Sequence, residues 1–341
     1  MKKMRIAING FGRIGRMVFR QAIVDEGVEV VAINARYPSE TLAHLIKYDS
    51  IHGPFNGDVQ ALHCGLKVNG KMVELVNSRE PDKLPWDRLD IDVVIEATGK
   101  FKSKESAGLH IQAGAKKVVI TAPGKQVDKT IVMGVNDHTY QPELDDVVSN
   151  ASCTTNCLAP VVKVLDDSFS IKNGLMTTVH SFTNDQNNLD NPHKDLRRAR
   201  SCSQSIIPTT TGAAKALGEV LPHLNGKLHG MALRVPTPNV SLVDLVVDVE
   251  KTVTIDEVND AFKAAANQQL NGIIHYSEEP LVSIDYTTTE FSSIIDGLST
   301  MVMEGNKIKV LAWYDNEWGY SKRVLDLAKL VGSNIKEHVE I

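Results

Sequence analysis

The stretch Met4-Arg-Ile-Ala-Ile-Asn-Gly-Phe-Gly-Arg-Ile-Gly15 decides the fold of this chain. Residues 4–9 are mainly apolar, as expected for a buried strand. The glycine pattern G-x-G-x-x-G follows at once, and residues 16–24 show helical periodicity. The pattern alone also occurs in plain structural turns, but a strand before it and a helix after it indicate dinucleotide binding. We therefore expect a cofactor at Gly10, Phe11, Gly12, Arg13, Ile14 and Gly15, with its pyrophosphate at the helix N-terminus.

A second apolar run, Val28–Asn34, completes a strand–helix–strand unit. An acidic side chain usually follows such a strand and binds the ribose hydroxyls of NAD. This chain instead carries Asn34, Ala35 and Arg36. No carboxylate would repel a 2′-phosphate there, and a guanidinium suits a phosphate dianion. The residues therefore favour NADP. The alternative is that Arg36 is a solvated loop residue and that Ala35 tolerates either cofactor, so NAD use stays open.

Two further apolar runs, 91–99 and 117–124, have strand length and end in small residues. Residues 111–115 resemble the end of a crossover helix, and 57–76 resemble a hairpin or small strands. Alternating strands and helices predict a mostly parallel sheet, whose ligands lie at the carboxyl ends of the strands. Cofactor contacts are therefore also expected at Thr98, Gly99 and Thr121.

The stretch Ser152-Cys-Thr-Thr-Asn-Cys157 lies between a short apolar strand and a helix. Unpaired N–H groups and a positive dipole at the start of a helix favour a thiolate. A thiolate is the nucleophilic form of cysteine, so Cys153 is a candidate nucleophile. The alternative is a buried structural cysteine, which is the usual role of a lone cysteine.

The pattern changes after this helix. A strand is expected over 174–182, and a long polar segment, 183–204, follows without clear periodicity. Loops of this length are usually functional or disordered. The later strands are expected at 228–234, 240–248 and 307–314, with helices at 254–269 and 317–332. The alternation within 240–248 predicts an antiparallel sheet with one covered face. The fold class is therefore α/β, with a second α+β domain.

Composition restricts the class of protein. The 341 residues are 42% hydrophobic and 23% charged, with a net charge of −5 and no basic patch. This argues against a nucleic-acid or membrane partner. The four cysteines are too few for a disulfide framework, and no signal peptide or membrane span is evident. A cytoplasmic location is expected. A metal site is not expected, because a zinc site needs further ligands and the sequence shows no second Cys/His cluster.

Several motifs together resemble the glyceraldehyde-3-phosphate dehydrogenase family over nearly the whole chain. They are the glycine turn, Ser152–Cys157, His180, Asp195-Leu-Arg-Arg-Ala-Arg200 and Trp313-Tyr-Asp-Asn-Glu-Trp-Gly-Tyr320. Within the family, the chain is most similar to the bacterial branch associated with NADP and gluconeogenesis. The erythrose-4-phosphate dehydrogenases are close functional relatives.

The resemblance implies a role for each matching residue. Cys153 would attack the aldehyde carbon, and His180 would act as the base. Inorganic phosphate would then cleave the thioacyl enzyme to give an acyl phosphate, and the reverse reaction would reduce an acyl phosphate. The substrate phosphate would bind Thr183 and Arg234, the attacking phosphate would bind Ser152, Thr154, Thr211 and Gly212, and Arg198 would serve both. Asn316 would hold the nicotinamide carboxamide, with Tyr320 behind the ring.

The resemblance also bears on the cofactor and on assembly. Asn191 stands where NAD-specific members carry an apolar residue near the adenosine ribose of a neighbouring subunit, which again favours NADP. The long loop near a neighbour's cofactor implies a homotetramer. The dinucleotide-binding domain would comprise 1–152 and 317–341, and the catalytic domain 153–316.

Two other functions remain open. Oxidation of erythrose 4-phosphate would use a four-carbon substrate and water as the acyl acceptor. A nucleotide-binding redox sensor without turnover would rely on Cys153 and Cys157, one helical turn apart. The sensor hypothesis gives no role to His180, Arg198 or Arg234.

Overall fold

The computed structural model describes residues 3–335. Among these residues the chain forms two compact units. Unit 1 contains residues up to 131, 139–151 and the segment from 321 onward, and unit 2 contains 132–138 and 152–320. We describe each unit by itself.

The described part of unit 1 is built on a nine-stranded sheet with the order β3-β4-β5-β2-β1-β6-β7-β9-β8. The strands are β1 (Met4–Asn9), β2 (Val28–Asn34), β3 (Val59–Leu62), β4 (Gly65–Val68), β5 (Lys71–Val76), β6 (Val93–Glu96), β7 (Lys117–Ile120), β8 (Lys129–Thr130) and β9 (Val147–Ser149). All neighbours pair in parallel except β3 with β4 and β4 with β5. The predicted parallel sheet and the predicted hairpin within 57–76 are confirmed.

The strand order reverses at β1, which has β2 on one side and β6 on the other. Helix α1 (Arg13–Ala22) connects β1 to β2, while α2 (Ser39–Lys47) and α3 (Lys104–Gln112) follow β2 and β6. A reversal of this kind leaves a crevice at the carboxyl ends of the strands, where doubly wound sheets bind ligands. The glycine loop follows β1 at this position.

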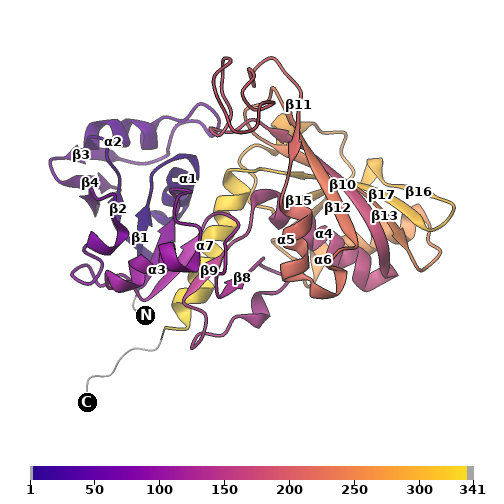
Figure 1. Ribbon diagram of the computed structural model, residues 1–341, viewed down its shortest axis with the longest axis horizontal. Helices are drawn as coiled ribbons and strands as arrows, with labels where there is room; N and C mark the ends of the chain where they lie inside the picture. Colours follow the sequence, from indigo (N-terminus) through magenta and orange to yellow (C-terminus); the bar gives the residue numbers. More distant parts are fainter. Residues whose placement is uncertain (1–2, 336–341) are drawn as a thin grey trace. The chain divides into compact units, whose positions relative to one another are not determined.

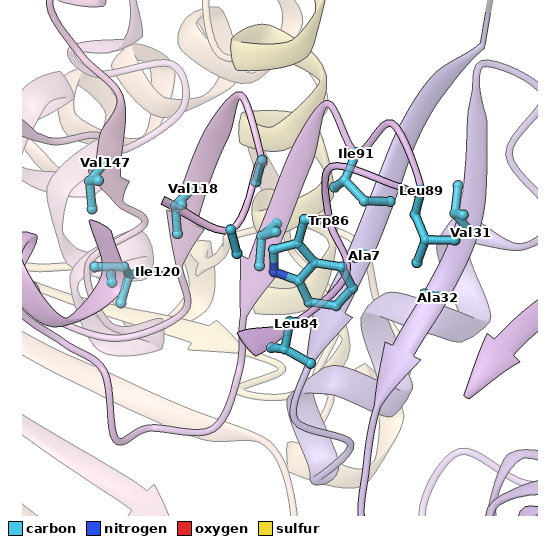
Figure 2. Packing of buried hydrophobic residues seen from close by; sticks show 14 residues of the cluster. Ala7, Val31, Ala32, Leu84, Trp86, Leu89, Ile91, Val118, Ile120 and Val147 are labelled. Carbon is cyan, nitrogen blue, oxygen red and sulfur yellow. The ribbon is translucent and has the colours of Figure 1, made fainter. Parts of the chain in front are cut away.

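One hydrophobic cluster of unit 1 surrounds Trp86, which is completely buried. Figure 2 shows its indole beside Ala7, Leu84 and Ile91. The indole N–H donates to His110 Nδ1 at 2.9 Å, so this buried polar atom is paired.

The described part of unit 2 has an eight-stranded sheet with the order β11-β12-β10-β13-β17-β15-β14, and β16 beside β17. The strands are β10 (Ile171–Ser181), β11 (Ile207–Thr210), β12 (Leu228–Val235), β13 (Ser241–Val249), β14 (Ile274–Ser277), β15 (Ser293–Asp296), β16 (Met301–Met303) and β17 (Lys307–Tyr314). Only β10 with β12 and β14 with β15 pair in parallel. Buried residues alternate with partly exposed ones along β13, so the predicted mostly antiparallel sheet with one covered face is confirmed.

Helices cover that face (Figure 1). Helix α4 (Cys153–Phe169) contacts β13, β15 and β17, and α5 (Ala213–Val220) contacts β12. Helix α6 (Ile255–Asn267) packs on α4 and β14, and α7 (Trp318–Ser333) ends the described chain. The helices predicted at 254–269 and 317–332 are confirmed within two residues.

Candidate active site

The first feature of unit 2 is a thiol beside an imidazole. Cys153 is the first residue of α4, and His180 is the penultimate residue of β10. Cys153 Sγ lies 3.5 Å from His180 Nε2. His180 Nδ1 lies 2.7 Å from the carbonyl oxygen of Ser181, which can only accept a hydrogen bond. An Arg234 terminal nitrogen, which can only donate, also lies 3.0 Å from Nδ1, but the Ser181 contact is the shorter of the two. The Ser181 contact places the proton of the neutral ring on Nδ1, so that Nε2 can accept the thiol proton.

The surroundings of His180 keep it neutral. Burial and the positive charge of Arg234 lower its pKa to about 3, although the hydrogen bond to the Ser181 carbonyl opposes this shift. A neutral imidazole next to a thiol is the protonation state that general-base catalysis requires.

Cys153 corrects one expectation from the sequence. Burial raises the pKa of its thiol above the ordinary value, although Arg234 and the hydrogen bonds from Thr154 act in the opposite direction. The prediction that the helix start favours a thiolate is therefore wrong for the free protein, because desolvation outweighs the helix N-terminus. Proton transfer to His180 becomes the route to the nucleophile.

Arg234 supplies a partly buried positive charge. The parallel register pairs His180 of β10 with Arg234 of β12, so the sheet places the two side by side. An Arg234 terminal nitrogen lies 3.0 Å from the Ser181 oxygen and 3.5 Å from the Thr183 hydroxyl. Arg234 Nε is buried without a partner, and no carboxylate within residues 3–335 forms an ion pair with this guanidinium. A partly buried cation without a carboxylate partner favours an anionic ligand.

Ser152 and Thr154, the residues on either side of Cys153, have partners within the protein. Ser152 caps α4, since its Oγ accepts from Thr155 N at 3.1 Å. Thr154 Oγ1 lies 2.9 Å from the hydroxyl of Tyr314, a buried residue of the Trp313–Tyr320 motif to which the sequence analysis assigned no role. A hydroxyl has one donor and two acceptor positions, so both residues retain capacity for a further bond.

The long loop before β11 brings a second cation to unit 2 (Figure 1). Arg198 forms an ion pair with Asp185, and its Nε donates to Thr209 Oγ1 at 3.1 Å. Thr211 accepts from the backbone N–H of Ala213 at 3.2 Å, directly before α5. Gly212 is the N-cap residue of α5 and has no side chain to satisfy the first N–H groups of that helix. This segment therefore presents several donors near one helix start.

Asn316 follows β17, and its side chain is almost completely buried. Its Oδ1 accepts hydrogen bonds from the hydroxyls of Ser181 and Ser241, each at 2.8 Å. Tyr320 lies buried in the first turn of α7. The two serines belong to none of the sequence motifs and are identified only through the strand register.

In unit 1 the glycine loop has the shape of a phosphate cradle. A side chain at Gly10 would meet Thr98 at 2.8 Å, and one at Gly15 would meet the Gly10 carbonyl oxygen at 2.1 Å. At Gly12, the N-cap of α1, a side chain would meet nothing within 4 Å. The loop is thus closely packed at Gly10 and Gly15 and open at Gly12, where the helix starts. This arrangement fits a pyrophosphate.

Two other side chains of the predicted cofactor site are bonded to groups within the protein. Arg13 pairs with the buried carboxylate of Asp49. The Asn34 amide nitrogen donates to Asn9 Oδ1 at 2.6 Å and to the Ser78 carbonyl oxygen, and Asn34 Oδ1 accepts from the Ser78 N–H. The side chain is therefore engaged within the protein and cannot also bind a ribose. Contacts of Arg13 and Asn34 with a cofactor would therefore involve their backbone.

The remaining predicted cofactor residues surround the same strand ends. Thr98 N donates to Glu96 Oε1 at 2.8 Å, and Thr121 Oγ1 donates to the Glu96 carbonyl at 3.1 Å. Gly99 has a positive φ of 69°. Phe11 packs edge-on against Phe19 at 5.5 Å. Ile14 is half-buried on the first turn of α1.

The residues from which the sequence predicts NADP use are accessible to solvent or partly so. Ala35 is half-buried and Arg36 is exposed, with no ion-pair partner for Arg36 among the described residues. Asn191 is exposed in the long loop, where its backbone N–H donates to the Ala199 oxygen at 2.9 Å.

Two features are absent from residues 3–335. We found no cluster of three or more His, Cys, Asp or Glu side chains that could hold a metal ion. Within the same residues, none of the helices has the length and apolarity to cross a bilayer.

Comparisons with known proteins agree with this geometry. The family profile "Glyceraldehyde 3-phosphate dehydrogenase, NAD binding domain" matches residues 4–104, and the corresponding C-terminal domain profile matches 152–316. The chain is 66% identical over 334 residues to "Glyceraldehyde-3-phosphate dehydrogenase 2" of Bacillus subtilis, covering 98% of each chain. Proteins of the same name are similar in Staphylococcus epidermidis (61% over 333 residues, 97% of each chain) and Staphylococcus aureus (62% over 329 residues, 96% of each chain). The chain therefore belongs to the glyceraldehyde-3-phosphate dehydrogenase family of NAD(P)-dependent oxidoreductases.

Proposed function

We propose that this chain interconverts glyceraldehyde 3-phosphate and 1,3-bisphosphoglycerate, with inorganic phosphate as the acyl acceptor and NADP as the preferred cofactor. One observation supports it above the others. A thiol within 3.5 Å of a neutral imidazole lies beside a partly buried guanidinium that has no ion-pair partner in residues 3–335. A nucleophile, a base and an anion site are the groups that a phosphorylated aldehyde requires.

The reaction follows from the protonation states of the two groups. His180 Nε2 takes the thiol proton as Cys153 Sγ bonds to the aldehyde carbon, and returns it to the carbonyl oxygen. His180 then takes that hydroxyl proton, and the C–H bond breaks to leave a thioester on Cys153. A nicotinamide cofactor, when bound, would supply the acceptor for this hydride. Phosphate oxygen finally attacks the thioester carbon, which forms the acyl phosphate and releases the Cys153 thiolate.

The two phosphates need separate groups of donors. We assign the substrate phosphate to Arg234 and Thr183, since Arg234 Nε is buried without a partner. The attacking phosphate is assigned to the donors around the starts of α4 and α5, which are Ser152, Thr154, Thr211 and Gly212. Arg198 would serve both by exchanging its bond to Asp185 for a bond to phosphate.

NADP preference rests on the end of β2. Ala35 offers no carboxylate to repel a 2′-phosphate, and the Arg36 guanidinium is exposed. The Asn34 clamp on Ser78 also keeps the following residue, the exposed Arg79, next to this strand end. Two guanidiniums near one strand end favour a phosphate dianion.

We also propose a homotetramer, with 1–152 and 317–341 as the dinucleotide-binding domain and 153–316 as the catalytic domain. A gluconeogenic role, in which the acyl phosphate is reduced, belongs to the same proposal.

The test is turnover of glyceraldehyde 3-phosphate with and without inorganic phosphate. We expect turnover to depend on phosphate, and Cys153→Ser to lower kcat by at least about a thousand-fold. Cys64→Ser, at an exposed cysteine, is the matched control and should keep full activity. Phosphate-independent oxidation with a preference for erythrose 4-phosphate would support the alternative substrate. Full activity of Cys153→Ser would contradict the mechanism.

A further inference from the structure

The side chain of Asn316 is held by two buried serines. Ser181 ends β10 and Ser241 begins β13, and both are at most 1% exposed. Their hydroxyls lie 2.8 Å from Asn316 Oδ1. Within residues 3–335, every hydrogen bond to the Asn316 side chain falls on this oxygen and none on its amide nitrogen.

The hydrogen-bond inventory favours this amide orientation. Ser241 Oγ already accepts from the backbone N–H of Ser181 at 3.1 Å, so its own proton needs an acceptor. With Asn316 Oδ1 facing the serines, both hydroxyl protons are satisfied. In the reversed amide, both hydroxyl oxygens would accept from Nδ2. Each hydroxyl proton would then have only the oxygen of the other serine, 3.4 Å away, as an acceptor among these groups. Unsatisfied buried donors are costly, so the serines select one orientation.

We propose that Ser181 and Ser241 are positioning residues that fix the Asn316 amide so that it presents its NH₂ group to the nicotinamide. This rests on the proposed function, which assigns Asn316 to the carboxamide. An NH₂ group is a donor only, so the site recognises the carbonyl oxygen of the carboxamide. It thereby selects which way the ring faces and which face takes the hydride.

Ser181 also connects this device to the base. Its backbone carbonyl accepts from His180 Nδ1 at 2.7 Å, while its hydroxyl donates to Asn316. One residue therefore sets both the tautomer of the base and the amide that orients the ring. The carbonyl stays in place when the hydroxyl is removed, so a serine-to-alanine change isolates the second role.

The experiment compares Ser181→Ala, Ser241→Ala and the double variant with the wild-type full chain. Ser277→Ala is the control, because Ser277 is also a buried serine of unit 2, but its hydroxyl bonds Glu279 N at 3.2 Å and the Tyr286 side chain instead of Asn316. Two readouts are needed. The first is the Kd ratio of the reduced cofactor to an analogue whose ring lacks the 3-carbonyl. The second is the face of deuteride transfer from a substrate deuterated at the aldehyde carbon.

In the double variant, we expect the preference for the carbonyl-bearing ring, measured by the Kd ratio, to be at least tenfold smaller than in the wild type. We also expect deuterium transfer to both faces of the ring. Each single variant should lose less, and Ser241→Thr, which keeps a hydroxyl, should retain the preference. An unchanged Kd ratio together with single-face transfer in the double variant would overturn the proposal. A loss of thermal stability alone with both readouts unchanged would mean a merely structural role and would overturn it too.

The two proposals fail separately. If the wild-type chain does not oxidise glyceraldehyde 3-phosphate, the proposed function fails, whereas the Kd ratio still tests the serines because it needs no aldehyde. If the wild type turns over and the double variant keeps the ratio, only the serine proposal fails.

Discussion

At the scale of single residues, His180 links the chemistry to stability. Its pKa is about 3 in the folded protein because of burial and Arg234, against about 6.5 in an unfolded chain. Between these two pH values the unfolded chain binds a proton that the folded chain does not. The free energy of unfolding must therefore fall as the pH falls from about 6.5 towards 3.

This predicts a difference between the wild type and His180→Asn, whose amide can still donate to the Ser181 carbonyl. The melting temperature of the wild type should fall more steeply between pH 7 and pH 5 than that of the variant, since asparagine does not titrate. Thermal unfolding followed by circular dichroism at several pH values measures both slopes. Parallel curves would show that His180 is not held neutral by the fold.

Ala35 gives a second residue-scale prediction, about the cofactor. Ala35→Asp should place a carboxylate where the 2′-phosphate lies, lower kcat/KM for NADP by at least about tenfold, and raise it for NAD. Arg36→Gln is the companion variant and should weaken NADP use without improving NAD use. Steady-state kinetics with both cofactors test this, and a wild type that already favours NAD would refute the preference.

At the scale of elements, the loop between β1 and α1 contains one glycine that is needed for packing and another that is open to a ligand. Gly10 has a φ of 96° and would clash with Thr98, whereas Gly12 is open. Gly12→Ala should therefore fold with an unchanged melting temperature but bind the dinucleotide at least about tenfold more weakly, because its methyl occupies space over the helix start. Gly10→Ala should instead lower the melting temperature. Calorimetry and cofactor titration distinguish the two, and normal cofactor binding by Gly12→Ala would contradict the assigned cradle.

Local elements could be predicted from the sequence because their signals are local. The bounds of β1, β2 and β17 were predicted correctly, and α4 begins at Cys153 as the strand-to-helix junction indicated. Contacts between distant segments could not be predicted. Thr154 and Tyr314 are 160 residues apart, and Ser181 and Asn316 are 135 apart. Sheet register, which no local pattern specifies, creates these pairs.

The thiol pKa could not be read from the sequence for a related reason. The helix start is a local signal and favours the thiolate at Cys153, whereas the burial that opposes it depends on the packing of unit 2. Motif resemblance pointed to these residues but gave no information on which effect dominates. The balance of desolvation and charge is a property of the packed unit.

At the scale of the whole molecule, the long loop before β11 bears on assembly. Leu189, Leu196 and Ile206 are 76%, 81% and 67% exposed in the single chain. Burying a leucine side chain contributes roughly 1.5–3 kcal/mol, so such exposure favours contact with another subunit. For the proposed homotetramer, we expect light scattering to give a mass four times that of the chain.

Replacing both leucines tests whether this loop holds the assembly together. Leu189→Asp with Leu196→Asp would bury two carboxylates in an apolar contact, so the mass should fall below that of the tetramer. Leu144→Asp, at a residue 67% exposed in unit 1, is the control and should leave the mass unchanged. Because Asn191 lies between the two leucines, the loop variant should also lose NADP affinity if this loop lines a neighbour's cofactor site. A tetramer that persists with unchanged NADP affinity would mean that the loop serves only its own subunit.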